Sequence, residues 1–192
     1  MNASIAKNET LLEVALAPLD FVRQVGLVIG FSLLTALSAQ IIIPVPPVPF
    51  TAQTFAVVLT GALLGSRLGA ITMIVYLIEG ACGLPFFSGG SGGILHLMGP
   101  TGGYLIAFPA AAFITGAFAE HEWDRKFLTA VAAMTIGTVL ILLAGWLWYS
   151  LVLRTSPALT VFPTVVRFIP GDLLKICLAA AVLPSGWKLV KR

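Results

Sequence analysis

Three long stretches of this chain contain no Asp, Glu, Lys or Arg. They are residues 24–66, 80–119 and 127–153, with lengths of 43, 40 and 27 residues. A helix needs about 20 consecutive apolar residues to cross the hydrocarbon core of a bilayer. The first stretch is therefore long enough for two membrane spans joined by a turn, and the third for one span. This pattern predicts an integral membrane protein with little chain outside the lipid.

The overall composition supports the same interpretation and excludes several classes of protein. Hydrophobic residues make up 58% of the chain and charged residues 10%, whereas soluble domains average about 45–50% and about 25%. This shortage of charge excludes a soluble enzyme, a disordered chain and a nucleic-acid-binding protein. Two cysteines, Cys82 and Cys177, are too few for a secreted domain held together by disulfides. The net charge of +3 does not imply a nucleic-acid partner.

Proline and glycine divide the first half of the chain into predicted membrane helices. Four prolines lie between positions 44 and 49, and proline cannot continue a helix. A tight turn is expected at 65–67, and residues 83–103 are rich in glycine and proline. The span between the first two breaks is short, so it must be tilted, incomplete or flanked by protein.

The second half is divided by a polar turn at 120–126 and by a loop holding Arg154 and Pro157. No strand-like alternation is apparent, and an open sheet cannot cross lipid. The predicted fold class is therefore all-α, a six-helix transmembrane bundle in one domain, 21–192, preceded by a cytosolic tail, 1–20, with a short helix at 8–17. The predicted spans are 22–43, 51–64, 68–82, 104–119, 127–153 and about 164–187.

Basic residues predict the orientation of this bundle. With six spans, both termini lie on one side of the membrane, and cytoplasmic loops carry an excess of Lys and Arg. Arg154 is the one basic residue in a loop on the opposite side, and Arg167 and Lys175 lie in or beside the sixth span. We therefore expect both termini in the cytoplasm and the chain in the cell membrane. The terminal side carries eight of the eleven basic residues: Lys7, Arg23, Arg67, Arg125, Lys126, Lys188, Lys191 and Arg192.

Two ionisable residues occur inside the sixth predicted span. Asp172 and Lys175 are three positions apart, so they share one helical face and can reach each other. A charge at the centre of a span costs about 2.5–3.5 kcal/mol, and such residues are usually functional. We interpret the pair as part of a ligand pocket, the alternative being an ion pair that only lowers its own insertion cost. Glu79, near the outer end of the third span, is an open candidate for the same pocket.

The glycine-rich segment 83–103 is the second candidate feature. Irregular backbone at membrane depth is tolerated when it is buried in protein or lines a cavity, and glycines such as Gly90 permit close approach to a ligand. Ser88 and Ser91 offer hydroxyls, and Phe86 and Phe87 offer apolar walls. The alternative is a flexible outer loop without a ligand.

The motifs of common catalytic sites are missing from that segment. The GGSGG run has no following GK[ST], so it is not a phosphate-binding loop, and no GxSxG is present for a serine hydrolase. His96 has no second His or Cys nearby at ligand spacing, so no metal is expected. The sequence therefore predicts neither catalytic residues nor an enzyme.

A GxxxG pattern, formed by Gly26 and Gly30, lies in the first span. Small residues four positions apart let a second helix approach closely. The partner helix is either within the bundle, which the residues alone favour, or on another subunit. Gly61 and Gly65 repeat the spacing and carry the same ambiguity.

Taken together, four motifs resemble the BioY family, the biotin-binding S components of energy-coupling factor (ECF) vitamin transporters. They are PVPPVPFTAQTFAVVLTGALLG, GLPFFSGGSGG, GPTGGYL and IPGDLLK, in that order along residues 24–188. The resemblance implies a six-helix fold with an outward-facing biotin pocket. It also implies a transmembrane coupling subunit and cytosolic ATPases as partners, although some members are thought to act without them.

Carried over residue by residue, the resemblance names a biotin site. Asp172 and Lys175 match the polar pair of the sixth helix, and Tyr104 the aromatic of GPTGGY. Gln53 follows an outer loop that serves as a lid, and Ser91 stands where relatives can have Asn, which puts one amide contact in doubt. The resemblance also favours Gly26 and Gly30 as the contact with the coupling subunit, and adds Gly90 to the biotin-binding loop.

The chemistry of biotin suits such a site, because an Asp–Lys pair can complement both the N–H donors and the carbonyl of its ureido group. No cofactor is expected beyond the ligand, and the remaining surface should contact membrane lipid. Three alternatives stay open: an S component for another vitamin such as thiamine or riboflavin, an intramembrane enzyme, and a structural or assembly protein.

Overall fold

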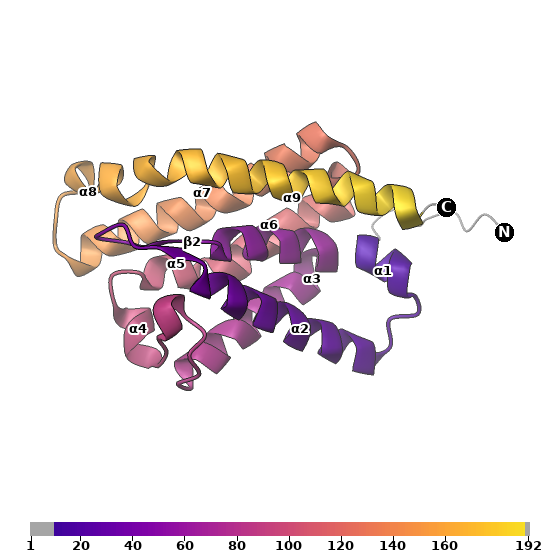
Figure 1. The fold of residues 1–192 in the computed structure, drawn as a ribbon, viewed down its shortest axis with the longest axis horizontal. Helices are drawn as coiled ribbons and strands as arrows, with labels where there is room; N and C mark the ends of the chain where they lie inside the picture. The colour runs from indigo at the N-terminus through magenta and orange to yellow at the C-terminus, as the bar shows by residue number, and fades with distance from the viewer. Residues whose placement is uncertain (1–9, 191–192) are drawn as a thin grey trace.

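The computed structural model describes residues 10–190, and this part of the chain is almost wholly helical (Figure 1). Short 3-10 turns are η1 (Ser88–Gly90), η2 (Trp123–Arg125) and η3 (Val166–Phe168), and the strands are β1 (Ile42–Ile43) and β2 (Phe50–Thr51). The α-helices are α1 (Leu11–Leu16), α2 (Phe21–Gln40), α3 (Gln53–Ala81), α4 (Ile94–Met98), α5 (Gly102–Ile106), α6 (Phe108–Glu120), α7 (Phe127–Val152), α8 (Pro157–Thr164) and α9 (Ile169–Val190).

Helix α3 is a hairpin of two helical arms. Gly65 interrupts it with φ 82° and ψ 178°, a conformation open essentially to glycine alone. The Gln53 side chain donates to the Tyr76 hydroxyl at 2.6 Å although 23 positions separate them, a separation of about 35 Å along a straight helix. The chain therefore reverses at Gly65, which confirms the predicted turn between two helical segments, at 51–64 and 68–82.

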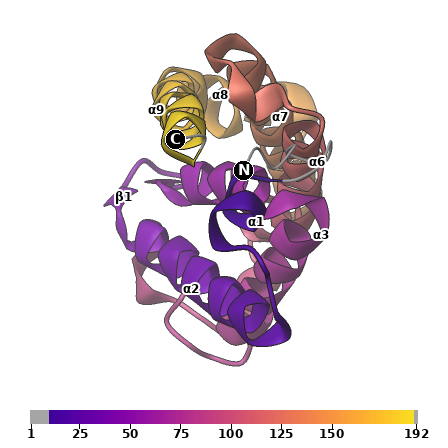
Figure 2. The same cartoon turned by 90° about the vertical axis from the view of Figure 1, so that its right-hand side faces the viewer.

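Six helical segments thus form the bundle: α2, the two arms of α3, the α5–α6 pair, α7 and α9. By length and composition, α2, α3, residues 102–120 and α7 can each cross a membrane. Figures 1 and 2 place α2 and α9 on opposite sides of the molecule, with α3 between them. The fold class is the predicted one, an all-α membrane bundle.

The first arm of α3, residues 53–64, lies at the centre of the bundle. Its twelve residues span about 18 Å, which is less than the hydrocarbon core. Ala56, Val57 and Val58 are nevertheless almost completely buried. This arm is therefore flanked by protein, one of the three possibilities that its short length predicted.

Glycine allows α3 and α6 to pack closely. A Cβ atom at Gly61 would collide with the carbonyl oxygen of Ala112, and one at Gly116 with the backbone at Gly65. Small residues at such crossings let two backbones approach without side chains between them. The ambiguity over Gly61 and Gly65 is resolved in favour of packing inside the bundle.

The chain ends lie at one end of the bundle, and the irregular segments at the other. Leu11 of α1 contacts Gly186 of α9, and Trp187 donates to Asp124 in the α6–α7 turn at 2.5 Å. At the opposite end, Arg167 donates to the carbonyl of Pro46 at 2.9 Å. Of the eight basic residues assigned to the terminal side, Lys7, Lys191 and Arg192 lie outside the described residues.

Two predicted connections contain secondary structure that the sequence did not indicate. The proline turn is closed by a β-hairpin, in which Ile42 pairs with Thr51 and Ile43 with Phe50, because the prolines hold the chain extended and leave backbone groups to be paired. The loop after Arg154 contains helix α8, with Pro157 in its first turn, a position where proline is favoured.

The sixth membrane helix also begins later than predicted, at Ile169 rather than near residue 164. Val165 leaves the helical region, with φ −129° and ψ −62°, so α8 ends before it. Pro170 then lies in the first turn of α9, where its missing N–H leaves no intrahelical bond unmade.

Candidate functional site

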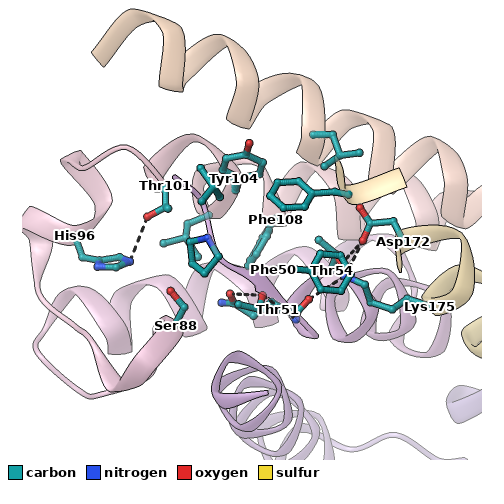
Figure 3. A pocket seen from close by; sticks show the side chains of 16 residues that line it. Phe50, Thr51, Thr54, Ser88, His96, Thr101, Tyr104, Phe108, Asp172 and Lys175 are labelled. Atoms are coloured by element: carbon teal, nitrogen blue, oxygen red, sulfur yellow. Dashed lines mark hydrogen bonds and ion pairs between the residues drawn. The ribbon is translucent and has the colours of Figure 1, made fainter. Parts of the chain in front are cut away.

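A cavity lies inside the end of the bundle that carries the β-hairpin and the glycine-rich segment (Figure 3). Its free volume is about 60 Å³, room for a few water molecules, so a vitamin-sized ligand requires part of the wall to move. The wall consists of Val48, Pro49, Phe50, Thr51, Gln53, Thr54, Ser88, His96, Thr101, Tyr104, Leu105, Phe108, Leu142, Phe168, Asp172 and Lys175.

The buried ion pair of α9 forms one end of this cavity. The Lys175 Nζ lies 2.6 Å from Asp172 Oδ1, and the side chains are 13% and 5% exposed. Asp172 lies in the first turn of α9, where the helix dipole favours a negative charge. Lys175 follows one turn later, so the spacing in the sequence produces the predicted contact.

The first arm of α3 supplies the partners of this pair. Lys175 Nζ also donates to the carbonyl of Thr51 at 2.9 Å and to the hydroxyl of Thr54 at 2.6 Å, which accounts for the three donors of an ammonium group. Thr54 donates in turn to Asp172 Oδ1 at 3.1 Å. In the described part of the chain, every hydrogen bond to the Asp172 carboxylate ends on Oδ1, which leaves Oδ2 as an available acceptor.

Phe50 of β2 covers the lysine. Its ring centroid lies 3.9 Å from Lys175 Nζ, a cation–π contact, and 5.8 Å from the ring centroid of Phe168. A Cβ at Gly171 would collide with the Phe50 ring, so the glycine of IPGD makes room for it. The β-hairpin is thus seated on α9 over the ion pair.

Gln53 and Tyr104 occupy fixed positions in the wall. Gln53 donates to the Tyr76 hydroxyl and accepts from the Thr51 hydroxyl at 2.9 Å. The Tyr104 hydroxyl donates to the carbonyl of Thr164 at 2.8 Å, so the ring rather than the hydroxyl is presented to the cavity. The structure therefore brings Gln53 and Tyr104 together with Asp172 and Lys175, as the sequence indicated.

Ser91 and Gly90 do not line the cavity themselves, but they follow a residue that does, Ser88. The Ser91 hydroxyl donates to the carbonyl of Ser88 at 2.7 Å, and it is Ser88 that lines the cavity. Phe87 is completely buried, and a Cβ at Gly80 would collide with its ring. Leu95 and Met98 of the same segment are 79% and 64% exposed, so the predicted packing holds for only part of it. Phe86 and Phe87, the predicted apolar walls, are not among the lining residues.

Two further sequence candidates lie outside the cavity. Glu79 accepts a hydrogen bond from Ser32 of α2 and is not among the lining residues. Within the part of the chain that the structure describes, no atom lies within 4 Å of the place that a Cβ on Gly26 or Gly30 would occupy. Both glycines lie on the face of α2 turned away from α3, so they do not mediate packing within the bundle.

Sequence reasoning missed Phe50, Thr54 and Thr101, and it weighed His96 as a metal ligand or base rather than as part of the wall. Of the two serines that it named for their hydroxyls, Ser88 lines the cavity and Ser91 does not. The His96 ring stacks on Phe87, with centroids 5.2 Å apart, and its Nε2 lies 3.4 Å from the Thr101 hydroxyl. Partial burial lowers the pKa of His96. The signal available in the sequence for Thr54 was its position one residue after Gln53, at the start of a membrane helix.

Comparisons with known proteins agree with this geometry. The BioY family profile matches residues 6–192. The "Probable biotin transporter BioY" of Pyrococcus horikoshii is 40% identical over 83% of this chain and 93% of its own length. The "Biotin transporter BioY" of Thermotoga maritima is 36% identical over 79% and 88%, and that of Rhizobium etli 34% over 81% and 84%.

A solved structure has the same fold. It is the S-component for biotin from an ECF-type ABC transporter, which superimposes with a TM-score of 0.81 at 25% identity and covers 87% of this chain and 92% of that chain. By the extent of the family match, the identity to its relatives and this shared fold, the chain belongs to the BioY family.

Proposed function

We propose that this protein binds biotin and serves its uptake across the cytoplasmic membrane, as the S component of an ECF transporter or as a solitary transporter. One observation carries the proposal: a buried Asp–Lys pair lines a cavity inside a membrane bundle and keeps one carboxylate oxygen available. Intramembrane charges that face a cavity mark substrate sites. The biotin-transporter names of the relatives point to the same ligand.

The polar end of the cavity complements a ureido group. Asp172 Oδ2 accepts from a ureido N–H, and a second amide hydrogen of Gln53 is available for the ureido oxygen. Lys175 holds Asp172 in place and can exchange Thr51 or Thr54 for the ligand. The rings of Tyr104 and Phe108 contact the thiophane ring, and Ser91 and Gly90 support the wall through Ser88.

Entry of biotin requires movement of the β-hairpin. The free volume of the cavity is small, and the Phe50 ring lies directly over Lys175. A ligand that reaches Lys175 must therefore displace this ring. The hairpin joins α2 to α3 and is held to the far side of the cavity by the bond from Arg167 to Pro46. Breaking that bond and lifting Phe50 opens the cavity toward the outer side.

The proposal extends to partners and orientation. Gly26 and Gly30 on the open face of α2 receive a helix of the coupling subunit, and ATPase subunits lie on the cytoplasmic side. Both termini are cytoplasmic, so the cavity opens outward. Arg67, Arg125 and Lys126, at the end of the bundle that carries α1, agree with the positive-inside rule, and lipid surrounds the exposed apolar faces.

Equilibrium binding tests this function. Purified protein in lipid nanodiscs should bind biotin, and bind thiamine and riboflavin at least about a hundredfold more weakly, since a buried group built to accept N–H discriminates strongly. Expression in a biotin auxotroph should support growth on low external biotin. Preference for another vitamin would replace biotin as the ligand, and the absence of binding for all three would overturn the transporter assignment.

A further inference from the structure

The cavity has a second polar end, formed by His96, Thr101 and Ser88. Figure 3 shows these three side chains together, on the side of the cavity away from Asp172 and Lys175. They come from three short segments of the glycine-rich region: η1, α4 and the link to α5. No hydrogen bond is made by the Ser88 hydroxyl within residues 10–190, and the Thr101 hydroxyl meets only His96, at 3.4 Å. This end therefore presents unsatisfied donors to the cavity.

The charges along the wall determine what these donors can bind. Among the described lining residues, Lys175 is the one Lys or Arg, and its charge is matched by Asp172 at 2.6 Å. Tyr104 is the remaining titratable lining group, and Glu79, on the arm of α3 beneath the segment, is bonded to Ser32. An anion at the second end would thus meet hydroxyl groups, one imidazole and no permanent positive charge.

We propose that His96, with Thr101 and Ser88, receives the carboxylate tail of the ligand and sets the preference of the site for the free acid over neutral derivatives. This proposal rests on the proposed function, because biotin carries its carboxylate at the end opposite the ureido group. A ligand whose ureido group binds Asp172 directs its tail toward the other end of the same cavity. A buried carboxylate there is stabilised most by a protonated imidazole, which donates from its nitrogen as a charged partner.

This arrangement couples binding to a proton. Burial lowers the pKa of His96 in the protein, so the imidazole is neutral at neutral pH, and an adjacent carboxylate raises that pKa. The bound state therefore takes up a proton that the free protein lacks, and affinity for the acid rises as the pH falls. Neutral derivatives of the same molecule gain nothing from the protonated imidazole and should show no such dependence.

The experiment compares biotin with biotinamide, which keeps the ureido group and lacks the charge. In wild-type protein in nanodiscs, the ratio of the two dissociation constants should favour biotin by about tenfold near pH 6 and fall toward about pH 8. Calorimetry in buffers of different ionisation enthalpy should detect proton uptake with biotin and none with biotinamide. The ratio is measured within one sample, so it does not depend on the fraction of folded protein.

The variant His96→Gln, which cannot titrate, should lose the pH dependence and the proton uptake, and His96→Leu should also lose most of the preference for the acid. His121→Gln is the matched control, because His121 is the second histidine of the chain and is exposed after α6; it should behave as wild type. An unchanged ratio and unchanged proton uptake in His96→Gln would overturn the inference while leaving the biotin assignment intact. Failure of the wild type to bind biotin would overturn both.

Discussion

Asp172 and Lys175 illustrate how a costly pair can be kept inside a membrane protein. The free-energy cost of removing two charges from water cancels much of their mutual attraction, so a buried pair also needs hydrogen bonds to other groups. Here Thr54 and the carbonyl of Thr51 supply them. Because Thr54 belongs to α3 and Thr51 to the preceding strand β2, the pair also links α9 to the centre of the bundle. Under the proposed function, Asp172 Oδ2, which accepts no hydrogen bond from residues 10–190, receives a donor from the ligand.

The first prediction disrupts this ion pair from each side. Asp172→Asn and Lys175→Ala should each weaken biotin binding by about tenfold or more, since a buried charged partner contributes roughly 1.5–3 kcal/mol. Thr54→Val should weaken it less, because Lys175 still holds the carboxylate. Binding is measured by calorimetry on membrane-inserted protein. Asp124→Asn, at the other end of the bundle, is the control for a buried carboxylate, and near-wild-type affinity in both main variants would refute the pocket assignment.

Asp124 is a second buried carboxylate, in the turn between α6 and α7. Its Oδ2 accepts from Trp187 at 2.5 Å, and its Oδ1 is buried with no hydrogen-bond partner among residues 10–190. Burial raises the pKa of Asp124 from 3.8 to about 6, against the lowering effect of the Trp187 hydrogen bond. The folded protein therefore binds this proton more tightly than the unfolded chain does.

The second prediction follows from this increase in the pKa of Asp124 on folding. Between pH 3.8 and about 6, stability should fall as the pH rises, because the folded state must release a proton that it holds more tightly; above about pH 6 this contribution is constant. Thermal unfolding in detergent should show this loss in the wild type and a smaller one in Asp124→Asn. Identical pH profiles for the two proteins would contradict the assigned pKa.

At the scale of the elements, the α3 hairpin depends on a single residue. Gly65 reverses the chain at φ 82°, and the Glu120 carboxylate accepts from the backbone N–H and hydroxyl of Ser66 at 2.7 and 2.8 Å. The backbone of the turn packs against Gly116 of α6. A side chain at position 65 meets both an unfavourable conformation and the Glu120 carboxylate.

The third prediction is that Gly65→Ala destabilises the protein by about 1–3 kcal/mol, the strain of a non-glycine residue in this region. Gly26→Ala is the matched control, because its helix position is open and alanine there should be neutral or stabilising by up to about 1 kcal/mol. Unfolding in denaturant compares the two. Equal stability of both variants would mean that the turn relaxes without strain.

Helix α2 has an inner face and an outer face with different roles. Ser32, Thr35 and Ala36 are buried against the bundle, whereas Gly26 and Gly30 are open. The fourth prediction is that Gly26→Leu combined with Gly30→Leu keeps biotin binding in isolated protein and loses ATP-dependent uptake in cells that supply the energising subunits. Bulky side chains would hold the partner helix away from this face.

Two outcomes would count against that assignment. If the double variant fails to accumulate or to bind biotin, the glycines serve the fold. If it binds and transports normally, the coupling subunit contacts another surface. A double variant on a different exposed apolar face, Leu143→Ala with Leu147→Ala on α7, should retain uptake and serves as the control.

At the scale of the whole molecule, the two ends of the bundle differ in character. One end joins α1, the Gly65 turn, the α6–α7 turn and the end of α9, and it carries most of the described basic residues. The other carries the β-hairpin, the glycine-rich segment and α8, around the cavity (Figure 1). A transporter subunit needs this asymmetry, because the ligand enters from one side and the energising partner acts from the other.

The fifth prediction tests which end faces outward. In a variant lacking Cys82 and Cys177, Ser156→Cys should react with an impermeant thiol reagent added to intact cells, and Glu122→Cys should not. Both positions are exposed, so reactivity depends on the side of the membrane and not on burial. The reverse labelling pattern, or labelling at both positions, would overturn the orientation.

The sequence by itself determined the class of fold and the nature of the site. The thickness of the bilayer requires long apolar stretches, and these can be recognised in the sequence without any knowledge of tertiary contacts. The spacing of Asp172 and Lys175 likewise lies within one helical turn, and their meeting needs only that the helix forms. For the same reason Gly65, between two apolar runs, was recognisable as a turn.

Only the tertiary structure decided what surrounds these features. Thr54 meets Asp172 and Lys175 across 118 and 121 positions, and Arg167 meets Pro46 across 121, distances over which no local pattern acts. The β-hairpin and α8 are likewise held by distant contacts: Phe50 packs on Lys175, and the Tyr104 hydroxyl donates to the carbonyl of Thr164. The same holds for His96, which lies alone in the sequence and becomes part of the site only when the glycine-rich segment folds against α3 and brings it to the cavity.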